Sequence, residues 1–309
     1  MPRNETEIIR IARVEDPRGN LSFVQNGGPG LPFGIRRAYW IYDVPGGRDR
    51  HGHAFRSSHE LIVALSGSFD VVATAPDGTT TRHHLCRSYY GLYVPPMTWR
   101  ALDNFSTNSV ALVLSSTAYN PGDYIEDFDI FSAEAAVADA TDSSPGTPPK
   151  PQDCQRIAGT APDGDNPFAD SSVDRCALLD LPRIVHPNGS LTFQQNDGAQ
   201  LPFDIRRVYY LYDIPGDSSR GGHAHRRNSS LIVAASGSFE VTLNDGARSR
   251  TFMLNRPYRG LYVPPGLWRE IGNFSSGAVC LVLTSELFSE DDYVRSRDQF
   301  LDLTASKRQ

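Results

Sequence analysis

The chain of 309 residues contains the same pattern twice, and this internal repeat constrains the fold more than any other feature. The stretch LPFGIRRAYWIYDVPGG (31–47) recurs as LPFDIRRVYYLYDIPGD (201–217). In the same way, GLYVPPMTWRALDNFS (91–106) recurs as GLYVPPGLWREIGNFS (260–275). We therefore expect two related halves, and the chain is long enough for each half to bury its own core.

The segment between the two copies has a different composition. It is rich in Ala, Pro, Asp, Ser and Gly and shows no sustained hydrophobic period. Such a segment cannot bury enough apolar surface to offset the entropy that is lost on ordering it. We therefore predict a first domain over 1–132, a mostly disordered linker over 133–173 and a second domain over 174–309.

Each copy has the local pattern of a β protein. Short runs such as RRAYWIYDV (36–44) and AVCLVLTS (278–285) are rich in β-branched and aromatic residues and are bounded by Gly, Pro or Asp-Gly turns. Helical periodicity is almost absent, and only the C-terminal stretches that begin at Asn120 and Ser289 look locally helical. The pattern predicts an all-β fold, with a jelly-roll sandwich or small barrel in each copy.

Composition limits the function classes. The net charge is −6 and the Lys and Arg residues are scattered, which does not favour nucleic-acid binding. No window approaches 18 apolar residues and the N-terminus lacks a signal-peptide core, so we expect no membrane association and a cytoplasmic location. The sequence has four cysteines, Cys86, Cys154, Cys176 and Cys280. Because they are far apart and lack CxxC spacing, we expect reduced thiols, with a single disulfide as the alternative.

The second copy contains a pair of histidines, His223 and His225, within GGHAHRRNSS (221–230). At positions i and i+2 the two side chains share one face of the predicted strand. An imidazole is half-protonated near neutral pH, so it can both remove and return a proton. The paired arrangement and its basic flanks favour a functional role over a structural one.

The first copy keeps a different part of the same motif. Its stretch HGHAFRSSHE (51–60) retains His53 but has Phe55 in place of the second histidine. It also carries Glu60, where the second copy has Ser230. Each copy has therefore lost a different chemical group.

The spacing of the Gly, His and Glu positions resembles the pattern of the cupins. In metal-binding cupins, three histidines and a carboxylate converge on one ion inside the barrel. Both copies here have an arginine where the third histidine belongs, Arg100 and Arg269, so neither retains a full set of ligands. We expect no metal and no other cofactor, with a bicupin metalloenzyme as the alternative.

Longer motifs resemble the cupin-fold sugar 3,4-ketoisomerases over nearly all of both copies. They include RRVYYLYDIP (206–215), RGGHAHRR (220–227) and DDYV (291–294). The resemblance implies an isomerase that moves the keto group of a dTDP-linked 4-keto-6-deoxyhexose between C4 and C3, in deoxy- and amino-sugar biosynthesis. It implies no metal or redox cofactor. A dTDP-sugar epimerase and a non-catalytic nucleotide-sugar-binding bicupin remain as alternatives.

The resemblance also suggests which residues form the site. Moving the keto group needs a base that takes the C3 proton and a donor or cation beside the oxygen that becomes negative. Either histidine could be the base. The predicted catalytic residues are His223, His225 and Tyr212, and the predicted substrate-binding residues are Arg18, Arg220, Tyr210, Trp268 and Arg269.

A second family signature is intact in the first copy only. DPRGNL (16–21) carries Arg18, which by resemblance contacts the diphosphate, whereas HPNGSL (186–191) has Asn188 there. Dimers of the family resemble a pair of barrels that exchange N-terminal strands. If the copies form such a pair within one chain, Arg18 joins the histidines of the second copy. We therefore predict an intrachain pseudo-dimer with one complete site, in the second domain, and leave further homo-oligomerisation and the product's C4 configuration open.

Overall fold

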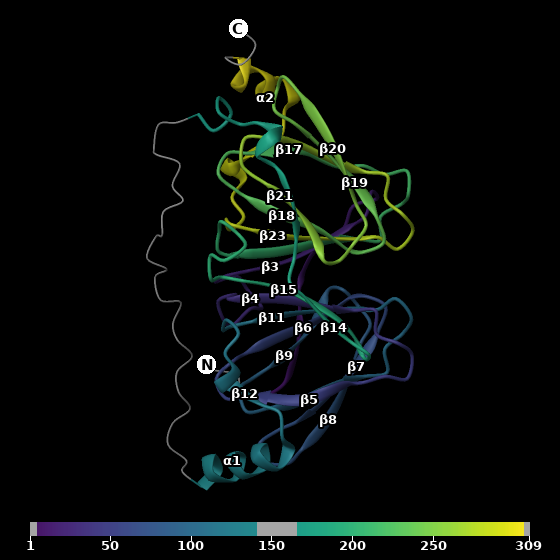
Figure 1. Ribbon diagram of the computed structural model, residues 1–309, viewed down its shortest axis with the longest axis vertical. Coiled ribbons are helices and arrows are strands. Elements are labelled where there is room, and N and C mark those ends of the chain that lie inside the picture. The colour runs from purple at the N-terminus through teal and green to yellow at the C-terminus, as the bar shows by residue number, and fades with distance from the viewer. Residues whose placement is uncertain (1–4, 141–165, 306–309) are drawn as a thin grey trace. The chain divides into compact units, whose positions relative to one another are not determined.

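The computed structural model describes residues 5–140 and 166–305, which fold into two compact units (Figure 1). Apart from the residues that are not described, unit 1 comprises Met1–Ala12, Asn26–Gln152 and Pro182–Asp197. Unit 2 comprises Arg13–Gln25, Asp153–Leu181 and Gly198–Gln309. Each unit therefore contains a short segment of the opposite sequence copy.

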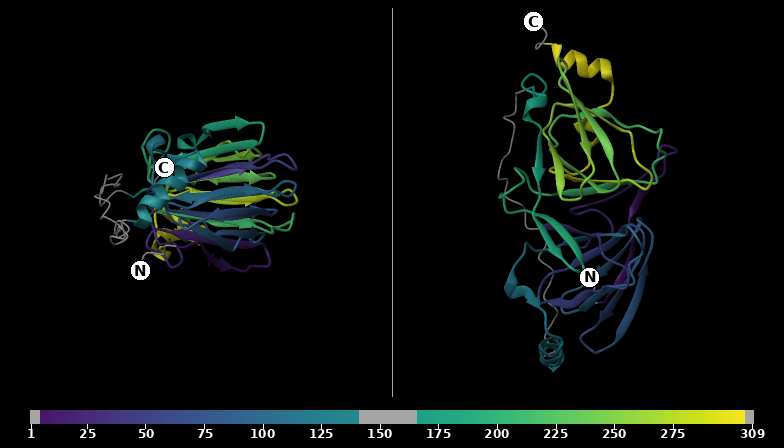
Figure 2. Two further views of the ribbon diagram at one scale, coloured as in Figure 1. Left: turned by 90° about the horizontal axis from the view of Figure 1, so that it is seen from below. Right: turned by 45° about the vertical axis from the view of Figure 1, so that its right-hand side comes forward.

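Unit 1 consists of two antiparallel sheets with a hydrophobic core between them (Figures 1 and 2). The larger sheet has the order β1 (Glu7–Arg10), β9 (Tyr90–Val94), β6 (Glu60–Ser66), β11 (Val110–Ser115), β4 (Arg37–Tyr42), β15 (Gly189–Gln195) and β14 (Arg183–His186). The smaller sheet has the order β12 (Tyr124–Ile125), β5 (Arg50–Phe55), β10 (Trp99–Asp103), β7 (Phe69–Thr74) and β8 (Thr80–Leu85).

Unit 2 repeats this architecture around its own core. Its larger sheet has the order β13 (Ala177–Asp180), β21 (Arg259–Val263), β18 (Ser230–Ser236), β23 (Val279–Thr284), β16 (Arg207–Tyr212), β3 (Asn20–Gln25) and β2 (Ala12–Val14). Its smaller sheet has the order β20 (Ser249–Leu254), β19 (Phe239–Asn244), β22 (Trp268–Gly272), β17 (Arg220–His225) and β24 (Tyr293–Val294). The prediction of an all-β chain with two repeated halves is confirmed.

Helices are few in the described part of the chain. Helix α1 (Phe128–Ala140) and helix α2 (Arg297–Leu303) follow the last strands of the two copies, where the sequence indicated local helix. The short 3₁₀ turns are η1 (Pro121–Asp123), η2 (Val173–Arg175) and η3 (Glu290–Asp292). Helix α1 occupies the start of the predicted linker, and residues 141–165 of that linker lie outside the described residues. None of the described helices is both long and apolar enough to span a membrane.

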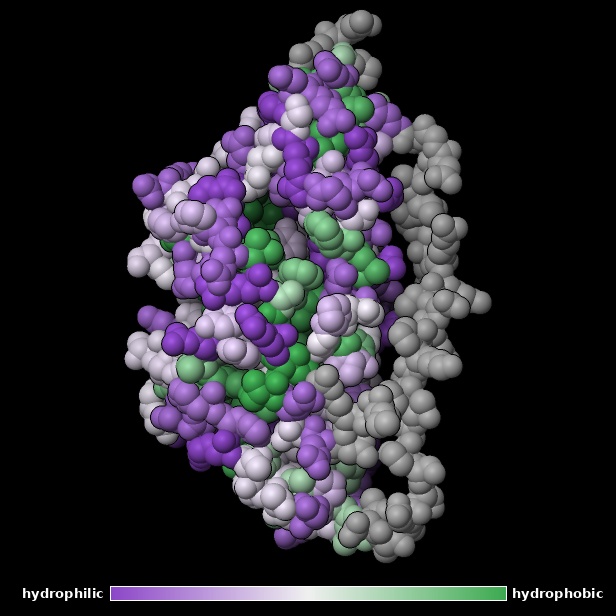
Figure 3. Space-filling view, turned by 180° about the vertical axis from the view of Figure 1, so that it is seen from behind, coloured by the Kyte–Doolittle hydropathy of each residue, from purple (hydrophilic) through white to green (hydrophobic). Residues whose placement is uncertain are grey.

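Alternating burial explains how strands such as β19 and β10 join the core. In β19, Phe239, Val241 and Leu243 are buried in the core of unit 2, and the residues between them are partly exposed. On the face shown in Figure 3, hydrophilic residues cover most of the surface and hydrophobic residues appear in patches between them. Several strands of the larger sheets differ, among them β16, because five of its six residues are buried and no period of two is visible.

The fifth strand in the order of each larger sheet, β4 or β16, pairs with a strand from the opposite copy. In unit 2, β3 runs antiparallel to β16 over its full length, from Asn20 opposite Tyr212 to Gln25 opposite Arg207. In unit 1, β15 pairs with β4 in the same register. Strands β3 and β15, which lie near the start of each copy, therefore extend the sheet of the other copy, whereas the first strands, β1 and β13, stay with their own copies.

A glycine allows the turn before β3 to approach the rest of unit 2. Gly19 has a φ of +114°, which L side chains rarely adopt. A Cβ at this position would lie only 2.6 Å from Cγ1 of Ile214. The turn that carries Arg18 therefore depends on glycine both for its backbone conformation and for its close packing.

Substitution Gly19→Ala should lower the free energy of unfolding by about 2–3 kcal/mol, because it adds backbone strain to a steric overlap. The control is Gly78→Ala. Gly78 also has positive φ (+84°), but none of the described atoms lies within 4 Å of the point that an alanine Cβ would occupy there. That control should lose only about 1 kcal/mol. Chemical denaturation measures both values, and equal losses would contradict the packing argument.

Candidate active site

Strand β17 brings both histidines of the second copy to one side of unit 2. His223 lies opposite Arg269 on β22, and His225 lies opposite Tyr293 on β24. Residues that are directly opposite in a sheet share a face, whereas the intervening Ala224 packs into a separate cluster beside α2. The ring centroids of the two histidines are 4.9 Å apart, and that of Tyr293 is 4.4 Å from the ring of His225.

The two imidazoles are neutral bases in this environment. Burial, followed by the positive charge of Arg269, lowers the pKa of both His223 and His225 well below 6.5. The Nε2 atoms of both rings are buried and have no hydrogen-bond partner within the described residues. Each ring can therefore take up a proton from a group placed beside its Nε2 atom.

Arg269 is a buried cation next to these histidines. Its relative exposure is 1 %, and its Nη1 donates to the hydroxyl of Ser230 at 3.1 Å. Its Nε has no hydrogen-bond partner, and no carboxylate in the described ranges forms an ion pair with it. Because a buried charge is costly unless it is paired, this arrangement suits a site that receives an anion.

The equivalent arginine of unit 1 has a permanent counterion. Arg100 donates from Nε to Oε2 of Glu60 at 2.8 Å and from Nη2 to the hydroxyl of Tyr39 at 2.7 Å. Tyr39 donates in turn to Oε1 of Glu60 at 2.5 Å. Burial acts to lower the pKa of Arg100, but the Glu60 carboxylate together with the Tyr39 and Tyr124 hydroxyls outweighs it, so that the pKa is raised. In unit 1 the Glu60 carboxylate therefore occupies the position that stays open beside Ser230 in unit 2.

Tyr209 occupies in unit 2 the place that Tyr39 has in unit 1. Burial raises the pKa of Tyr209 to about 12, although the charge of Arg269 acts in the opposite direction. Its hydroxyl therefore keeps its proton at neutral pH and is available to donate a hydrogen bond. Its counterpart Tyr39 and the counterpart of Arg269, Arg100, bind one carboxylate together in unit 1.

Arg18, from the first copy, lies in unit 2 beside the start of β17. Its guanidinium binds both oxygens of Asp16, at 3.0 Å and 2.8 Å, and Nη1 of Arg220 lies 3.2 Å from Oδ2 of the same carboxylate. The hydrogen bond from the Arg18 side chain is the main reason that the pKa of Asp16 is well below its usual range. Two guanidinium groups are thus held within one cluster, which suits a phosphate ligand.

The corresponding turn of unit 1 has lost this cluster. His186 and Asn188 replace the aspartate and the arginine, and the Asn188 N–H bonds to Nδ1 of His186 at 3.2 Å. Arg50, the counterpart of Arg220, donates to the carbonyl of Gly189 at 3.1 Å. Unit 1 therefore keeps the counterpart of Arg220 and lacks the counterpart of Arg18.

Three of the sequence-predicted residues lie away from the histidines. Tyr210 and Tyr212 occupy the opposite face of β16 from Tyr209, and the Tyr212 hydroxyl is 3.0 Å from that of Ser22. Trp268 packs in the cluster beside α2, and its Nε1 donates to Glu270 at 2.9 Å. The sequence could not select between the two faces of β16, because tyrosines lie on both of them.

Asp292, whose carboxylate contacts His225, is not among the residues predicted from the sequence. The only available signal was the DDYV motif, which does not show which of its two aspartates faces the histidine. No cluster of three or more His, Cys, Asp or Glu side chains suited to a metal ion occurs in the described ranges. Arg269 instead places a positive charge at one of the four ligand positions of a metal-binding cupin.

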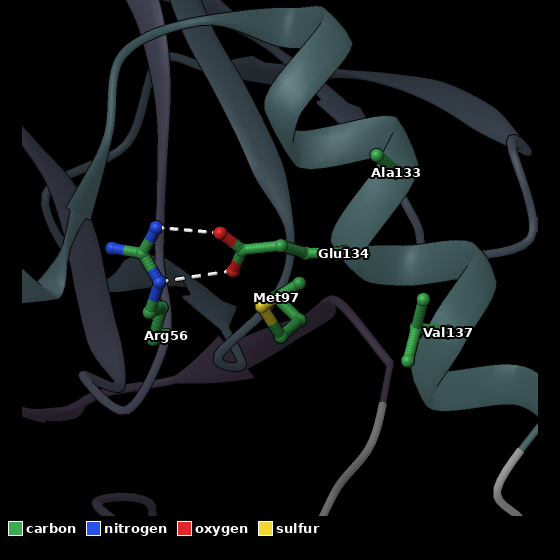
Figure 4. Close-up of a pocket in the computed structure, with 5 residues that line it drawn as sticks. All are labelled: Arg56, Met97, Ala133, Glu134 and Val137. Atoms are coloured by element: carbon green, nitrogen blue, oxygen red, sulfur yellow. Dashed lines mark hydrogen bonds and ion pairs between the residues drawn. The ribbon is translucent and has the colours of Figure 1, made fainter.

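A separate pocket in unit 1 contains none of the predicted residues. It lies beside helix α1 and is lined by Arg56, Met97, Ala133, Glu134 and Val137 (Figure 4). Two hydrogen bonds, of 2.9 Å and 2.6 Å, join Arg56 and Glu134 across it. This ion pair fastens α1 to β5 and the following loop, and we assign the pocket no chemistry.

Comparisons with known proteins agree on one family. The family model described as FdtA, WxcM-like, C-terminal matches residues 4–136 and again 174–305. The chain is 38 % identical over 123 residues to the TDP-4-oxo-6-deoxy-alpha-D-glucose-3,4-oxoisomerase of Aneurinibacillus thermoaerophilus, a match that covers 40 % of this chain and 88 % of that protein.

Two solved structures are similar to one copy at a time. A 3,4-ketoisomerase from Helicobacter canadensis is 37 % identical, with 42 % of this chain and 98 % of that chain covered and a TM-score of 0.41. A sugar 3,4-ketoisomerase from Thermoanaerobacterium thermosaccharolyticum, in complex with TDP, is 34 % identical, with 44 % and 98 % covered and a TM-score of 0.42.

Reciprocal substitutions test the contrast between the two arginines. Glu60→Ser should lower the free energy of unfolding by about 3–5 kcal/mol, because it leaves Arg100 buried without its counterion. Ser230→Glu should raise stability, because it gives Arg269 the carboxylate that Arg100 already has. Thermal and chemical unfolding of the full chain measure both changes. A stabilising Glu60→Ser, or a strongly destabilising Ser230→Glu, would contradict the proposed charge balance.

Proposed function

The chain belongs to the FdtA family, described as WxcM-like, C-terminal, and on that premise we propose that it is a dTDP-sugar 3,4-ketoisomerase with one active site, in unit 2. Its substrate would be a dTDP-linked 4-keto-6-deoxyhexose. The proposal is supported by the name of the similar Aneurinibacillus relative, a 3,4-oxoisomerase of a TDP-linked 4-oxo-6-deoxy sugar.

The buried guanidinium of Arg269 is the observation that carries the proposal. It lies beside two neutral imidazoles and a protonated tyrosine. Its hydrogen-bond partner is the hydroxyl of Ser230, whereas the equivalent arginine of unit 1 binds the carboxylate of Glu60. Keto-group migration passes through an enediolate, whose oxygen carries negative charge. Arg269 and Tyr209 would stabilise that oxygen, as Arg100 and Tyr39 bind the carboxylate of Glu60.

The proposed reaction moves two protons and no other atoms. One imidazole takes the proton from C3, and the electron pair of the C–H bond forms the C3–C4 double bond as O4 becomes an oxyanion. O4 then accepts a proton, O3 loses its proton to form the new ketone, and C4 receives a proton from an imidazole. His223 and His225 are suited to these transfers because both are neutral and have free Nε2 atoms within the described structure.

The remaining charged groups would bind the nucleotide. Arg18 and Arg220 meet at Asp16, and a diphosphate placed there would interact with both guanidiniums. Tyr209 takes the role that the sequence assigned to Tyr212, since the latter lies on the other face of β16.

Unit 1 is proposed to be non-catalytic. It has Phe55 in place of the second histidine and Asn188 in place of Arg18, and Glu60 already binds Arg100. We propose that the two sequence copies, 1–132 and 174–309, form an intrachain pseudo-dimer through their exchanged strands.

A cytoplasmic location is part of the proposal. The described cysteines, Cys86, Cys176 and Cys280, are free thiols, which agrees with a reducing compartment.

Incubation with dTDP-4-keto-6-deoxyglucose in heavy water tests the function directly. We expect the keto group to migrate from C4 to C3 and deuterium to enter the sugar at those carbons, as observed by NMR. His225→Asn should lower kcat by about 10²–10⁴-fold, because it removes one proton carrier. Ser230→Glu should also inactivate the enzyme, because its carboxylate would occupy the Arg269 site.

The matched control is His53→Asn in unit 1, which should leave turnover unchanged. Inversion at a carbon without migration of the keto group would instead indicate an epimerase. Binding without any deuterium exchange would indicate a non-catalytic nucleotide-sugar binder. Either result, or full activity of His225→Asn, would overturn the proposal.

A further inference from the structure

Asp292 and His225 form a buried pair in unit 2. The Nδ1 atom of His225 lies 2.9 Å from Oδ2 of Asp292, and the side chains are 1 % and 4 % exposed. Asp292 is the last residue of η3 and directly precedes Tyr293, which pairs with His225 across the β17–β24 ladder. The contact therefore follows from the register of these two short strands.

The position of the Asp292 carboxylate is fixed independently of the histidine. Its Oδ1 accepts the backbone N–H of Arg227 at 2.7 Å, just beyond the end of β17. Its own backbone is held as well, because its carbonyl accepts from the N–H of Arg226 at 2.8 Å and its N–H bonds to Ser289. Only the second oxygen, Oδ2, is directed at the imidazole.

This contact selects one tautomer of His225. A carboxylate oxygen can only accept, so Nδ1 carries the proton and Nε2 carries the lone pair. The Nε2 atom is the one that is buried without a partner in the described residues, on the side of the ring away from Asp292. A base needs that lone pair, and the opposite tautomer would present an N–H group instead.

Unit 1 shows the same carboxylate without its imidazole. Oδ1 of Asp123 accepts both the N–H and the hydroxyl of Ser57, each at 2.7 Å, as Oδ1 of Asp292 accepts from Arg227. Phe55 stands where His225 stands in unit 2, and Oδ2 of Asp123 is buried with no partner among the described side chains. The structural contact made through Oδ1 is therefore separable from the contact that Oδ2 makes with a histidine.

We propose that Asp292 is a positioning residue, which holds His225 in the Nδ1-protonated tautomer with Nε2 available for proton transfer. The inference rests on the proposed function and adds to it a residue that need not touch the substrate. Asp123 retains the structural half of this role in unit 1, where Phe55 replaces the histidine that it would orient.

The test compares Asp292→Asn with the matched variant Asp123→Asn in the full chain. Asparagine preserves the shape and can still accept at Oδ1, but it can also donate to Nδ1 and so favour the wrong tautomer. We expect Asp292→Asn to lower kcat by about 10²-fold or more with little change in KM. Asp123→Asn should leave both constants unchanged.

The ¹⁵N chemical shifts of His225 give a reading that does not depend on turnover. They should show a protonated Nδ1 in the native chain and a protonated Nε2 in a large fraction of Asp292→Asn. An unchanged tautomer, or equal loss of activity in both variants, would overturn the inference. If the native chain shows no ketoisomerase activity, the proposed function fails, and the tautomer still decides the role of Asp292.

Phe55→His provides a second variant if Asp292→Asn does not fold. It should rebuild the pair in unit 1, so that the new imidazole is protonated at Nδ1 by its contact with Asp123. Adding Asp123→Asn to that variant should shift the proton to Nε2. The same tautomer in both variants would contradict the proposal.

Discussion

The ladder between β3 and β16 is the interaction on which the rest of unit 2 depends. It joins a strand of the first sequence copy to a strand of the second and continues without a break over six residue pairs. On its core side, Leu21 from the first copy packs with Tyr209 and Leu211 from the second. Because the turn with Arg18 immediately precedes β3, the same ladder brings that arginine to Arg220. A change in register by one residue would move Leu21 to the opposite face and displace the whole cluster.

Duplication explains how the two copies could lose different groups. In unit 2, Arg269 is buried without a carboxylate partner, which lowers the stability of the fold. The same unpaired charge is available to bind an anion in a catalytic site. In unit 1, Glu60 removes that cost by forming a closed network with Arg100 and Tyr39. The strand exchange places the damaged turn, with Asn188, beside the barrel that also lacks the second histidine. The loss of the second histidine and the loss of the arginine therefore fall in the same unit, and unit 2 keeps His225 and Arg18.

Features that depend on local spacing or on the internal repeat could be predicted from the sequence. The repeat predicted two β halves, and the HxH spacing predicted that His223 and His225 share a face, as the ladder with β22 and β24 shows. Comparing which group each copy lacks also led to the expectation that Arg18 joins the site of the second copy. Strand β3 pairs with β16 and Arg18 shares Asp16 with Arg220, and a role for Arg18 in that site stays a prediction.

Other features could not be predicted because they depend on packing. Burial of both faces of β16 removes the alternation that distinguishes Tyr209 from Tyr210 and Tyr212. Trp268 and Arg269 are adjacent in the sequence but point to opposite sides of β22, and nothing local to them indicates which side holds the histidines. Asp292 contacts His225 across a ladder of only two residue pairs, too short to recognise without the structure.

The central claim is that the chain has one composite nucleotide site, completed in unit 2 by Arg18. Calorimetric titration of the full chain with dTDP measures it most directly, with Arg18→Met and the unit 1 counterpart Asn188→Ala as the paired variants. The account predicts one dTDP per chain, an affinity that falls on the order of tenfold or more in Arg18→Met, and no change in Asn188→Ala. Two equivalent sites per chain, or an affinity that Arg18→Met leaves intact, would contradict it.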